Sequence, residues 1–392
     1  MAMTKQAVWV YLDHAATTPV DGDVVARMLP YFSENYGNPS SIHQAGQIAE
    51  AAVEESRAKI ARILDSEPDE VIFTGCGTES DNLALNGAAQ INRIKKGARH
   101  ILTTPVEHHA VFATVRHLAE RYGFELELLP VDRFGMVDPQ EVEKRVRADT
   151  AITSVIYANN EIGTINPIAE IGQICREREV PFHTDGVQAA AYLRMNVIRD
   201  NIDYLACGAH KFYGPKGVGF LYCRKDAPIE AYQTGGSQER GLRAGTHNVP
   251  LIVGMAEAFY QTQVKCQKRA ETYISLRDTI IKTILENIPG SHLTGHPSQR
   301  LPNHASFVFE GVNGNDLLIL LDQAGFGCSS GSACKSGSPK PSEVLLAIGL
   351  SPELALGSLR VTLGRNTTQD QITTFLEVLP GLIHHARKMA HR

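Results

Sequence analysis

Residues 202–222 read IDYLACGAHKFYGPKGVGFLY, and this stretch decides the fold. Two short apolar runs, each the length of a buried strand, flank a turn that contains Gly, Pro and Lys211. Ligands of open α/β sheets bind beyond the carboxyl ends of the strands, which is where this turn places the Lys211 amine. Taken alone, a lysine in a turn is more typical of an exposed surface position. The surrounding sequence is therefore needed to choose between a ligand-binding lysine and an exposed one.

The same alternation continues on both sides of this stretch. Short runs rich in β-branched residues are separated by amphipathic segments such as ESDNLALNGAA (79–89) and IAEIGQICRERE (168–179). This order predicts an α/β fold with a mostly parallel sheet, and we expect a large domain over residues 20–258. The other predicted strands are VIFTG (71–75), HILTT (100–104), AITSVIYA (151–158) and PFHTD (181–185).

The chain beyond residue 258 follows a different pattern. Helical periodicity is combined there with isolated strands, so we expect a smaller α+β domain made of residues 1–19 and 259–392. Its predicted elements are one long helix at 255–288, strands at 304–310 and 358–364, and a final helix from Gln369.

The composition excludes several classes of function. Of the 392 residues, 43% are hydrophobic and 21% are charged, and the formal net charge is −5. No apolar run approaches the roughly 18 residues that cross a bilayer, so no membrane association is predicted. The negative net charge disfavours binding to nucleic acid, whose phosphates need a concentrated basic surface. The first twelve residues contain no apolar signal-peptide core, so a cytoplasmic location is expected.

The seven cysteines are scattered, and none forms a C-x-x-C pair. This spacing disfavours a disulfide scaffold and a zinc site, and no metal site is predicted. Two of the cysteines, Cys328 and Cys334, lie in FGCSSGSACKSGSPKPS (326–342), a stretch rich in Gly, Ser and Pro. Such a composition predicts a mobile loop whose cysteines are accessible.

Two motifs suggest how an anionic ligand with an aromatic ring would bind. VIFTGCGTESDN (71–82) predicts a strand, a turn and then a helix beginning near Thr78. The first N–H groups of that helix, with the Thr78 hydroxyl, would form a phosphate-binding site. Asp185 ends the predicted strand PFHTD and could pair with a protonated pyridine nitrogen. The alternative for Asp185 is a helix cap or a turn.

Two further residues have more than one interpretation. His108, in VEHHA, could cover a ring or carry a proton, or it could be a loop histidine with no such role. Arg360, in SLRVTL, shares one face of its strand with Ser358 and Thr362. It could clamp a carboxylate through two hydrogen bonds, or form a surface salt bridge.

Together these fragments resemble the NifS/IscS-type cysteine desulfurases, which are fold-type-I pyridoxal-phosphate transferases. The resemblance covers nearly the whole chain, with ten motifs in family order. They are LDHAATTP (12–19), YGNPSSIH (36–43), FTGCGTESDN (73–82), VEHHA (106–110), NNEIG (159–163), HTDGVQ (183–188), AHKFYGPKG (209–217), QERGLRAGT (238–246), SSGSAC (329–334) and SLRVTLG (358–364).

The resemblance implies a role for each matching residue. The implied cofactor is pyridoxal 5′-phosphate, bound covalently by Lys211, and the implied substrate is L-cysteine. The other implied cofactor contacts are Asp185 to the pyridinium, Gln188 to the ring hydroxyl, His108 stacked on the ring, and Gly77, Thr78 and His210 at the phosphate. Thr246 is implied to reach the phosphate of the other subunit's cofactor, which implies a homodimer. Asn38, Asn160 and Arg360 are implied to bind the substrate.

The SSGSAC motif distinguishes between reactions. Transamination has no use for a cysteine on a Gly/Ser loop, whereas sulfur transfer needs an accessible and movable thiolate. The resemblance implies that Cys334 attacks the substrate's sulfur and keeps it as a persulfide, with release of L-alanine. Lys211 or His108 would remove the α-proton. The persulfide would go to a sulfur acceptor or an iron–sulfur scaffold protein, for iron–sulfur cluster or other sulfur-cofactor synthesis.

Some positions depart from the family pattern, and three alternatives stay open. Gly208 stands where the family often has a serine that contacts the phosphate, Gly77 stands where many relatives have alanine, and Cys328 has no counterpart role and is expected to be structural. A selenocysteine lyase or a class V aminotransferase would share Lys211 and Asp185. A non-catalytic sulfur-relay or scaffold protein could retain the same fold.

Overall fold

The computed structural model describes residues 9–331 and 340–390. Its larger part is built on a seven-stranded sheet with the order β2-β8-β7-β6-β5-β3-β4. Strand β8 is antiparallel to both of its neighbours, and the pairs from β7 to β4 are parallel. The predicted mostly parallel α/β sheet is therefore confirmed. The strands are β2 (Val71–Thr74), β3 (His100–Thr103), β4 (Glu125–Leu128), β5 (Thr150–Ser154), β6 (Phe182–Asp185), β7 (Tyr204–Gly208) and β8 (Gly219–Cys223).

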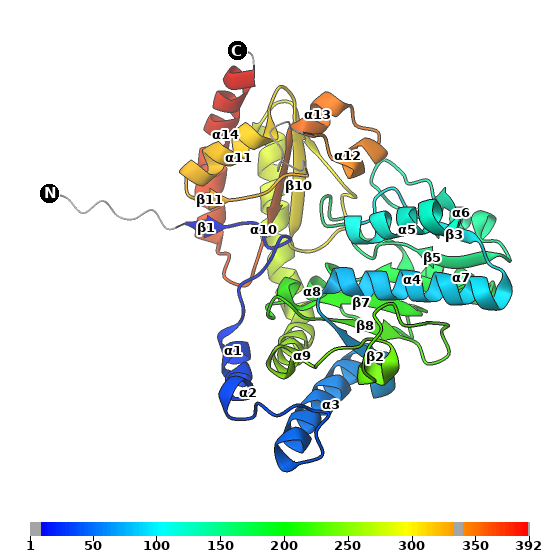
Figure 1. Cartoon of the computed structure of the whole chain (residues 1–392). Helices are drawn as coiled ribbons and strands as arrows, with labels where there is room; N and C mark the ends of the chain where they lie inside the picture. Colours follow the sequence, from blue (N-terminus) through cyan, green and yellow to red (C-terminus); the bar gives the residue numbers. More distant parts are fainter. Residues whose placement is uncertain (1–8, 332–339, 391–392) are drawn as a thin grey trace.

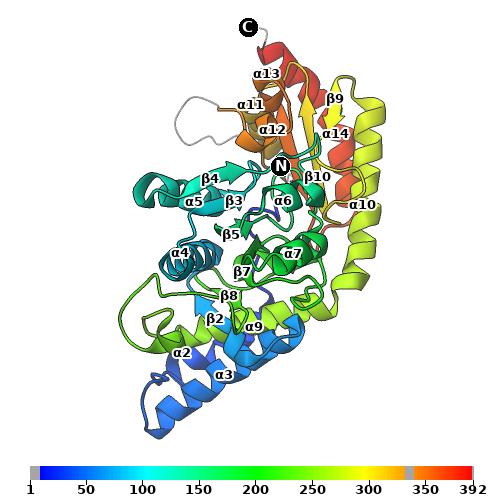
Figure 2. The same ribbon diagram turned by 90° about the vertical axis from the view of Figure 1, so that its right-hand side faces the viewer.

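Helices cover both faces of this sheet because its strands are apolar on both sides. On β8, Phe220 and Tyr222 face one core while Leu221 faces the other, as the two-residue period of a strand requires. Figure 2 shows α4 on one side of the sheet and α7 and α9 on the other. The helices of this part are α1 (Gly22–Met28), α2 (Pro30–Ser33), α3 (Gln44–Leu64), α4 (Gly77–Lys96), α5 (His109–Tyr122), α6 (Pro139–Arg145), α7 (Ile168–Glu177), α8 (Ala189–Tyr192) and α9 (Val249–Val264), with short 3-10 turns η1 (Pro68–Glu70), η2 (Ala209–Lys211) and η3 (Gln238–Gly241).

A smaller part of the molecule is built on two small sheets. A three-stranded antiparallel sheet has the order β12-β10-β9, and β1 pairs with β11 in parallel. Figure 1 shows its helices α11 and α14 at the opposite end of the molecule from α1 to α3. The elements are β1 (Val10–Tyr11), α10 (Cys266–Asn287), β9 (Ser291–Leu293), β10 (His304–Phe309), α11 (Gly314–Gln323), β11 (Phe326–Gly327), α12 (Glu343–Ala347), α13 (Pro352–Leu356), β12 (Ser358–Thr362) and α14 (Gln369–Ala390).

The structure corrects the single long helix predicted at 255–288. Two helices, α9 and α10, meet at Lys265, whose φ of −101° and ψ of 5° end the first and precede the second. The periodicity of the sequence runs through this junction without a Gly or Pro, so no local signal marks the break. The break lets α9 pack on α1 and α3 while α10 packs on α14.

The structure also corrects part of the mobile loop predicted at 326–342. Phe326–Gly327 forms strand β11, and the backbone of Ser329 exchanges two hydrogen bonds with Arg360, at 2.7 and 3.3 Å. Pairing with strands distant in sequence fixes these residues despite their composition. Cys334 itself lies outside the described residues. No helix in the described part of the chain is long and apolar enough to cross a membrane.

The Phe259 side chain on α9 is expected to contribute strongly to stability. Its ring lies 5.3 Å from that of Phe212 and 5.4 Å from that of Phe220, and all three are fully buried. Phe259→Ala should therefore cost about 3–5 kcal/mol of unfolding free energy. The neighbouring and exposed Tyr260 serves as control, since Tyr260→Ala should cost about 1 kcal/mol or less. Urea unfolding measures both, and equal losses would contradict this assignment of the core.

Candidate active site

Lys211 lies beyond the carboxyl end of β7, where the sequence predicts it. Strand β7 ends at Gly208, and the turn η2 carries the lysine back over the sheet edge. Its Nζ donates hydrogen bonds to the carbonyl oxygens of Ala15 and Ala16, at 2.6 and 2.8 Å. Burial, together with the nearby positive charge of Arg360, lowers the pKa of Lys211 to about 8. A lysine with this pKa is partly neutral near physiological pH and can act as a nucleophile or a base.

A cavity of about 220 Å³ surrounds this amine at the sheet edge. It brings together eight of the residues that the sequence predicts for the site. They are Gly77, Thr78, His108, Asn160, Asp185, Gln188, His210 and Lys211. Because they come from five separate motifs, the fold assembles them from distant parts of the chain.

One wall of the cavity is the N-terminus of α4. The side chain of the N-cap residue Cys76 makes no capping hydrogen bond, so the first N–H groups of the helix are left for a ligand. Gly77 lies close to the neighbouring segments, since a Cβ there would come within 2.7 Å of Val187 Cγ2. A Cβ on Gly208 would in turn lie 3.3 Å from the Gly77 nitrogen. The two glycines therefore let the helix N-terminus approach the sheet edge, which is a suitable site for a phosphate group.

Asp185 and Gln188 place acceptor oxygens in the same cavity. Asp185 ends β6, and its Oδ1 accepts a hydrogen bond from the Val187 N–H at 2.9 Å. Burial raises the pKa of Asp185, an effect that the neighbouring His108 and Lys211 oppose. Gln188 donates through Nε2 to the Ala15 carbonyl at 2.9 Å, while its buried Oε1 has no partner within the described structure. A cation beside Asp185 and a hydroxyl beside Gln188 would satisfy both groups.

Two histidines border the cavity in neutral forms. His108 caps α5, with Nδ1 accepting a hydrogen bond from the Ala110 N–H at 3.1 Å. Burial lowers the pKa of His108, and Lys211 adds to the effect while Asp185 opposes it. His210 lies 3.1 Å from the Thr17 hydroxyl, and burial lowers its pKa to about 4. Neutral rings can stack on an aromatic ligand or exchange protons with it.

Arg360 approaches the cavity from the three-stranded sheet. It lies on β12, where Nη2 forms an ion pair with Asp13 at 2.8 Å and Nη1 donates to the Asn160 carbonyl at 3.0 Å. The predicted face shared with Ser358 and Thr362 is buried rather than exposed. The alternative of a surface salt bridge is therefore wrong, because this arginine is almost fully buried beside a residue that lines the cavity.

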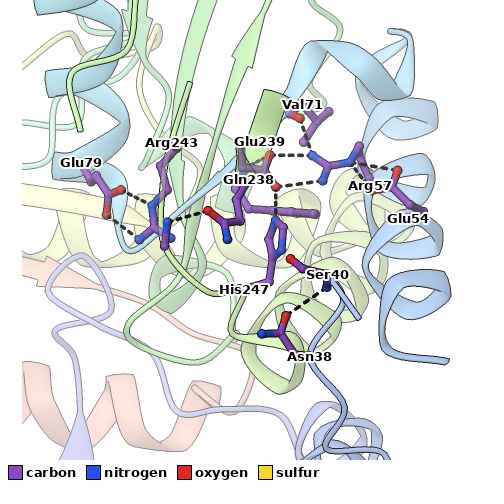
Figure 3. Close-up of polar contacts among 12 residues, drawn as sticks. Asn38, Ser40, Glu54, Arg57, Val71, Glu79, Gln238, Glu239, Arg243 and His247 are labelled. Atoms are coloured by element: carbon purple, nitrogen blue, oxygen red, sulfur yellow. Dashed lines mark hydrogen bonds and ion pairs between the residues drawn. The ribbon is translucent and has the colours of Figure 1, made fainter. Parts of the chain in front are cut away.

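Two predicted site residues lie elsewhere on the same chain. Asn38 and Thr246 are both exposed and do not line the cavity. Asn38 accepts a hydrogen bond from the Ser40 N–H at 3.0 Å, close to the segment that carries Glu239 and His247 (Figure 3). Their predicted contacts with a substrate and with a second subunit stay predictions. Cys334 also stays a prediction, since it lies outside the described residues.

Glu239 holds this segment in place. Its carboxylate accepts hydrogen bonds from both terminal nitrogens of Arg57, at 2.7 and 2.9 Å, and lies 2.6 Å from His247 Nε2 (Figure 3). Glu239 itself has a left-handed backbone, with φ of 47°, which a non-glycine residue adopts only under constraint. Burial alone would raise the pKa of Glu239, but these contacts lower it to about 2.

The sequence did not reveal the position of three acidic side chains at the site. Asp81 lines the cavity, and its Oδ1 lies 3.3 Å from His183 Nε2. Burial raises the pKa of Glu107, next to His108, to about 8. Asp13 pairs with Arg360 across 347 positions. Asp81 and Glu107 belong to motifs quoted above. Nothing in those motifs indicates, however, that the two side chains are buried beside the cavity.

Comparison with known proteins is consistent with this geometry. Residues 10–375 match the family described as aminotransferase class-V. The chain is 47% identical to a protein named cysteine desulfurase IscS from Methanosarcina thermophila, over 97% of this chain and 93% of that one. A solved structure titled NifS-like protein superposes with a TM-score of 0.90 at 36% identity, covering 96% of this chain and all of the other. Another, titled SspA in complex with cysteine, has a TM-score of 0.79 at 34% identity, covering 90% of this chain and 98% of that one.

The lowered pKa of Lys211 can be measured by chemical labelling. In the ligand-free chain, labelling of Lys211 by a small amine-reactive reagent should reach half its maximum near pH 8, not near the ordinary lysine value of about 10.4. Mass spectrometry of the Lys211 peptide follows the reaction. Arg360→Gln should raise this midpoint and Asp13→Asn should lower it, because the two charges act in opposite directions. An unshifted midpoint in both variants would contradict the electrostatic explanation.

The Arg57–Glu239 contact is expected to be important for stability. Glu239→Gln removes the buried counter-ion of Arg57, leaves it only the exposed Glu54, and should cost about 3–5 kcal/mol of unfolding free energy. Glu54→Gln is the control, because Glu54 also pairs with Arg57, at 3.1 Å, but is 56% exposed. That change should cost about 1 kcal/mol or less. Equal shifts in the urea midpoints of the two variants would show that burial does not determine the strength of these pairs.

Proposed function

The chain belongs to the class-V aminotransferase family and, within it, to the IscS-type cysteine desulfurases, and we propose that Lys211 holds its pyridoxal 5′-phosphate while Cys334 takes sulfur from L-cysteine. Enzymes of this family depend on pyridoxal 5′-phosphate. The observation that carries the proposal is the single cavity that contains Lys211, Asp185 and the N-terminus of α4. The structure similar to this chain that is titled SspA in complex with cysteine supports the substrate.

The residues around the cavity fit the cofactor group by group. The N-terminus of α4 at Gly77 and Thr78, with His210, would hold the phosphate. Asp185 would pair with the ring nitrogen, and the unpartnered Oε1 of Gln188 would accept from the ring hydroxyl. His108 would cover the ring face. When bound, the cofactor withdraws electrons from the substrate's α-carbon.

The chain's own groups would move the protons. With its pKa near 8, the Lys211 amine can accept the α-proton once the substrate has displaced it. His108, held neutral by burial, is the second candidate base. Arg360 and Asn160 would orient the substrate carboxylate, since the guanidinium and the Asn160 carbonyl are already joined at 3.0 Å. Arg360 would then give up part of its ion pair with Asp13 and bind the substrate carboxylate instead.

Sulfur transfer would be carried out by Cys334. Its thiolate attacks the substrate's sulfur, forming a new S–S bond while the sulfur–carbon bond breaks. The electron pair of the broken bond stays on the carbon skeleton, which takes up protons and leaves as L-alanine. The enzyme retains the sulfur as a persulfide on Cys334. An acceptor thiol then takes that sulfur, for iron–sulfur cluster or other sulfur-cofactor synthesis.

A homodimer in which Thr246 reaches the cofactor of the other subunit is part of this proposal. Thr246 is exposed and lies outside its own cavity, as such a role requires. The segment from α1 to the beginning of α3 exposes several large apolar side chains, which favours a protein interface there. They are Val25, Leu29, Phe32, Tyr36, Ile42 and Ile48. A cytoplasmic location is also proposed, and the six cysteines of the described residues, all of them free thiols, support it.

The proposed function is tested by measuring alanine from L-cysteine under reducing conditions, with the visible spectrum recorded on each protein. Cys334→Ala should keep the yellow cofactor but lose alanine production by on the order of a thousandfold or more, as expected for a lost nucleophile. Lys211→Ala should lose the bound colour. Cys328→Ala is the matched control and should retain activity. Alanine from Cys334→Ala at the wild-type rate would contradict the proposal and favour an aminotransferase or lyase.

A further inference from the structure

Glu161 lies next to a residue of the cofactor cavity and has no role in the proposed function. It follows Asn160, and its own backbone N–H donates to Asn159 Oδ1 at 2.8 Å. Asn159 is fully buried and donates through Nδ2 to the Val106 carbonyl, also at 2.8 Å. The backbone that carries Glu161 is therefore rigidly held at the edge of the cavity.

The Glu161 carboxylate lies beside Gly331 and Ser342, on either side of the segment 332–339 that contains Cys334. On one side, the Ser342 hydroxyl donates to Glu161 Oε2 at 2.5 Å. On the other, Gly331 lies so near that a Cβ there would be 2.7 Å from the same oxygen. One carboxylate oxygen thus brings together two residues that are eleven positions apart in the chain.

Each end is also fixed by a second set of contacts. The Gly331 N–H donates to the Ser358 hydroxyl at 3.2 Å, on the strand that carries Arg360. Ser342 is the N-cap of α12, and its hydroxyl accepts from the Leu345 N–H at 3.2 Å. Gly331 and Ser342 are therefore both held in the folded structure where they lie beside Glu161.

The joined ends lie beside the site of the chemistry. A second cavity of about 220 Å³ is lined by Glu161, Gly331 and Ser342, together with His108 and Asn160. Because His108 and Asn160 line the cofactor cavity as well, the two cavities are neighbours. Gly331 and Lys340, the described residues on either side of the segment with Cys334, therefore both line a cavity that borders the cofactor cavity.

We propose that Glu161 is a positioning residue for sulfur transfer: its carboxylate joins Gly331 to Ser342 and so sets where the Cys334 segment begins and ends relative to the substrate. This inference rests on the proposed function of Cys334. Glu161 is not among the residues that line the cofactor cavity, so we expect it to act on the step in which Cys334 participates.

The test separates the Glu161 contact from ordinary helix capping. Ser342→Ala removes the hydroxyl that Glu161 binds, and Ser351→Ala removes an equivalent N-cap of α13, whose hydroxyl accepts from the Leu354 N–H at 3.3 Å and is hydrogen-bonded to the exposed carboxylate of Glu353 rather than to Glu161. Ser342→Ala should lower kcat by on the order of ten- to a hundredfold, the effect of a small misplacement of a reacting group. The KM for L-cysteine and the cofactor colour should not change. Ser351→Ala should have the wild-type kcat, and Ser342→Thr, which keeps a hydroxyl, should restore most of the activity.

A double-mutant cycle identifies Glu161 as the partner. Glu161→Ala should lower kcat at least as much as Ser342→Ala, and the two changes together should lower it no further. Persulfide on Cys334, trapped by alkylation after a single turnover, should form correspondingly slowly. Equal kcat values for Ser342→Ala and Ser351→Ala, or additive losses in the double variant, would overturn the proposal. Wild-type alanine production by Cys334→Ala would instead overturn the proposed function, so the two failures are distinguishable.

Discussion

The hydrogen bonds from the Lys211 amine to the carbonyls of Ala15 and Ala16 are the contact on which the site depends. They join the carboxyl edge of the seven-stranded sheet to the segment 12–18, which also accepts from Gln188 through Ala15. The same segment holds Arg360 of the smaller sheet through Asp13. One short piece of chain, with a turn at residues 14–16, therefore sets the distance between the lysine and the arginine.

Burial gives these groups their chemistry. Taking Lys211 out of water lowers its pKa, and the same burial raises the pKa of Asp185 and of Glu107. Charges of opposite sign lie close enough to offset part of this cost, as Asp185 does for Lys211. A ligand with a cationic nitrogen and an anionic phosphate would offset more of this cost. It would present its positive group to Asp185 and its negative group to the N-terminus of α4.

Much of the fold and most of the site could be predicted from the sequence. The runs 71–75, 100–104 and 202–206 are predicted as strands because buried strands are short and rich in apolar residues. Lys211 and Asp185 could be placed because Asp185 ends such a run and Lys211 lies in the turn just beyond one. Strand β4 was not predicted, since its sequence ELEL carries two glutamates.

What the sequence could not reveal depends on contacts between distant residues. The break at Lys265 and the strand at Phe326–Gly327 are set by packing partners far away in the chain, and no local signal marks them. The joining of Gly331 and Ser342 by Glu161 likewise arises only when three separate segments meet. Tertiary packing thus decided the places where local patterns were ambiguous.

The central claim is that sulfur passes from L-cysteine, bound beside Lys211, to Cys334. The most direct measurement is peptide mass spectrometry after one equivalent of L-cysteine carrying a heavy sulfur isotope, with free thiols alkylated and no reductant added. One heavy sulfur atom is expected on the peptide that contains Cys334, and none on that peptide in Lys211→Ala. Heavy sulfur on another cysteine, or on Cys334 in the Lys211→Ala protein, would contradict the claim.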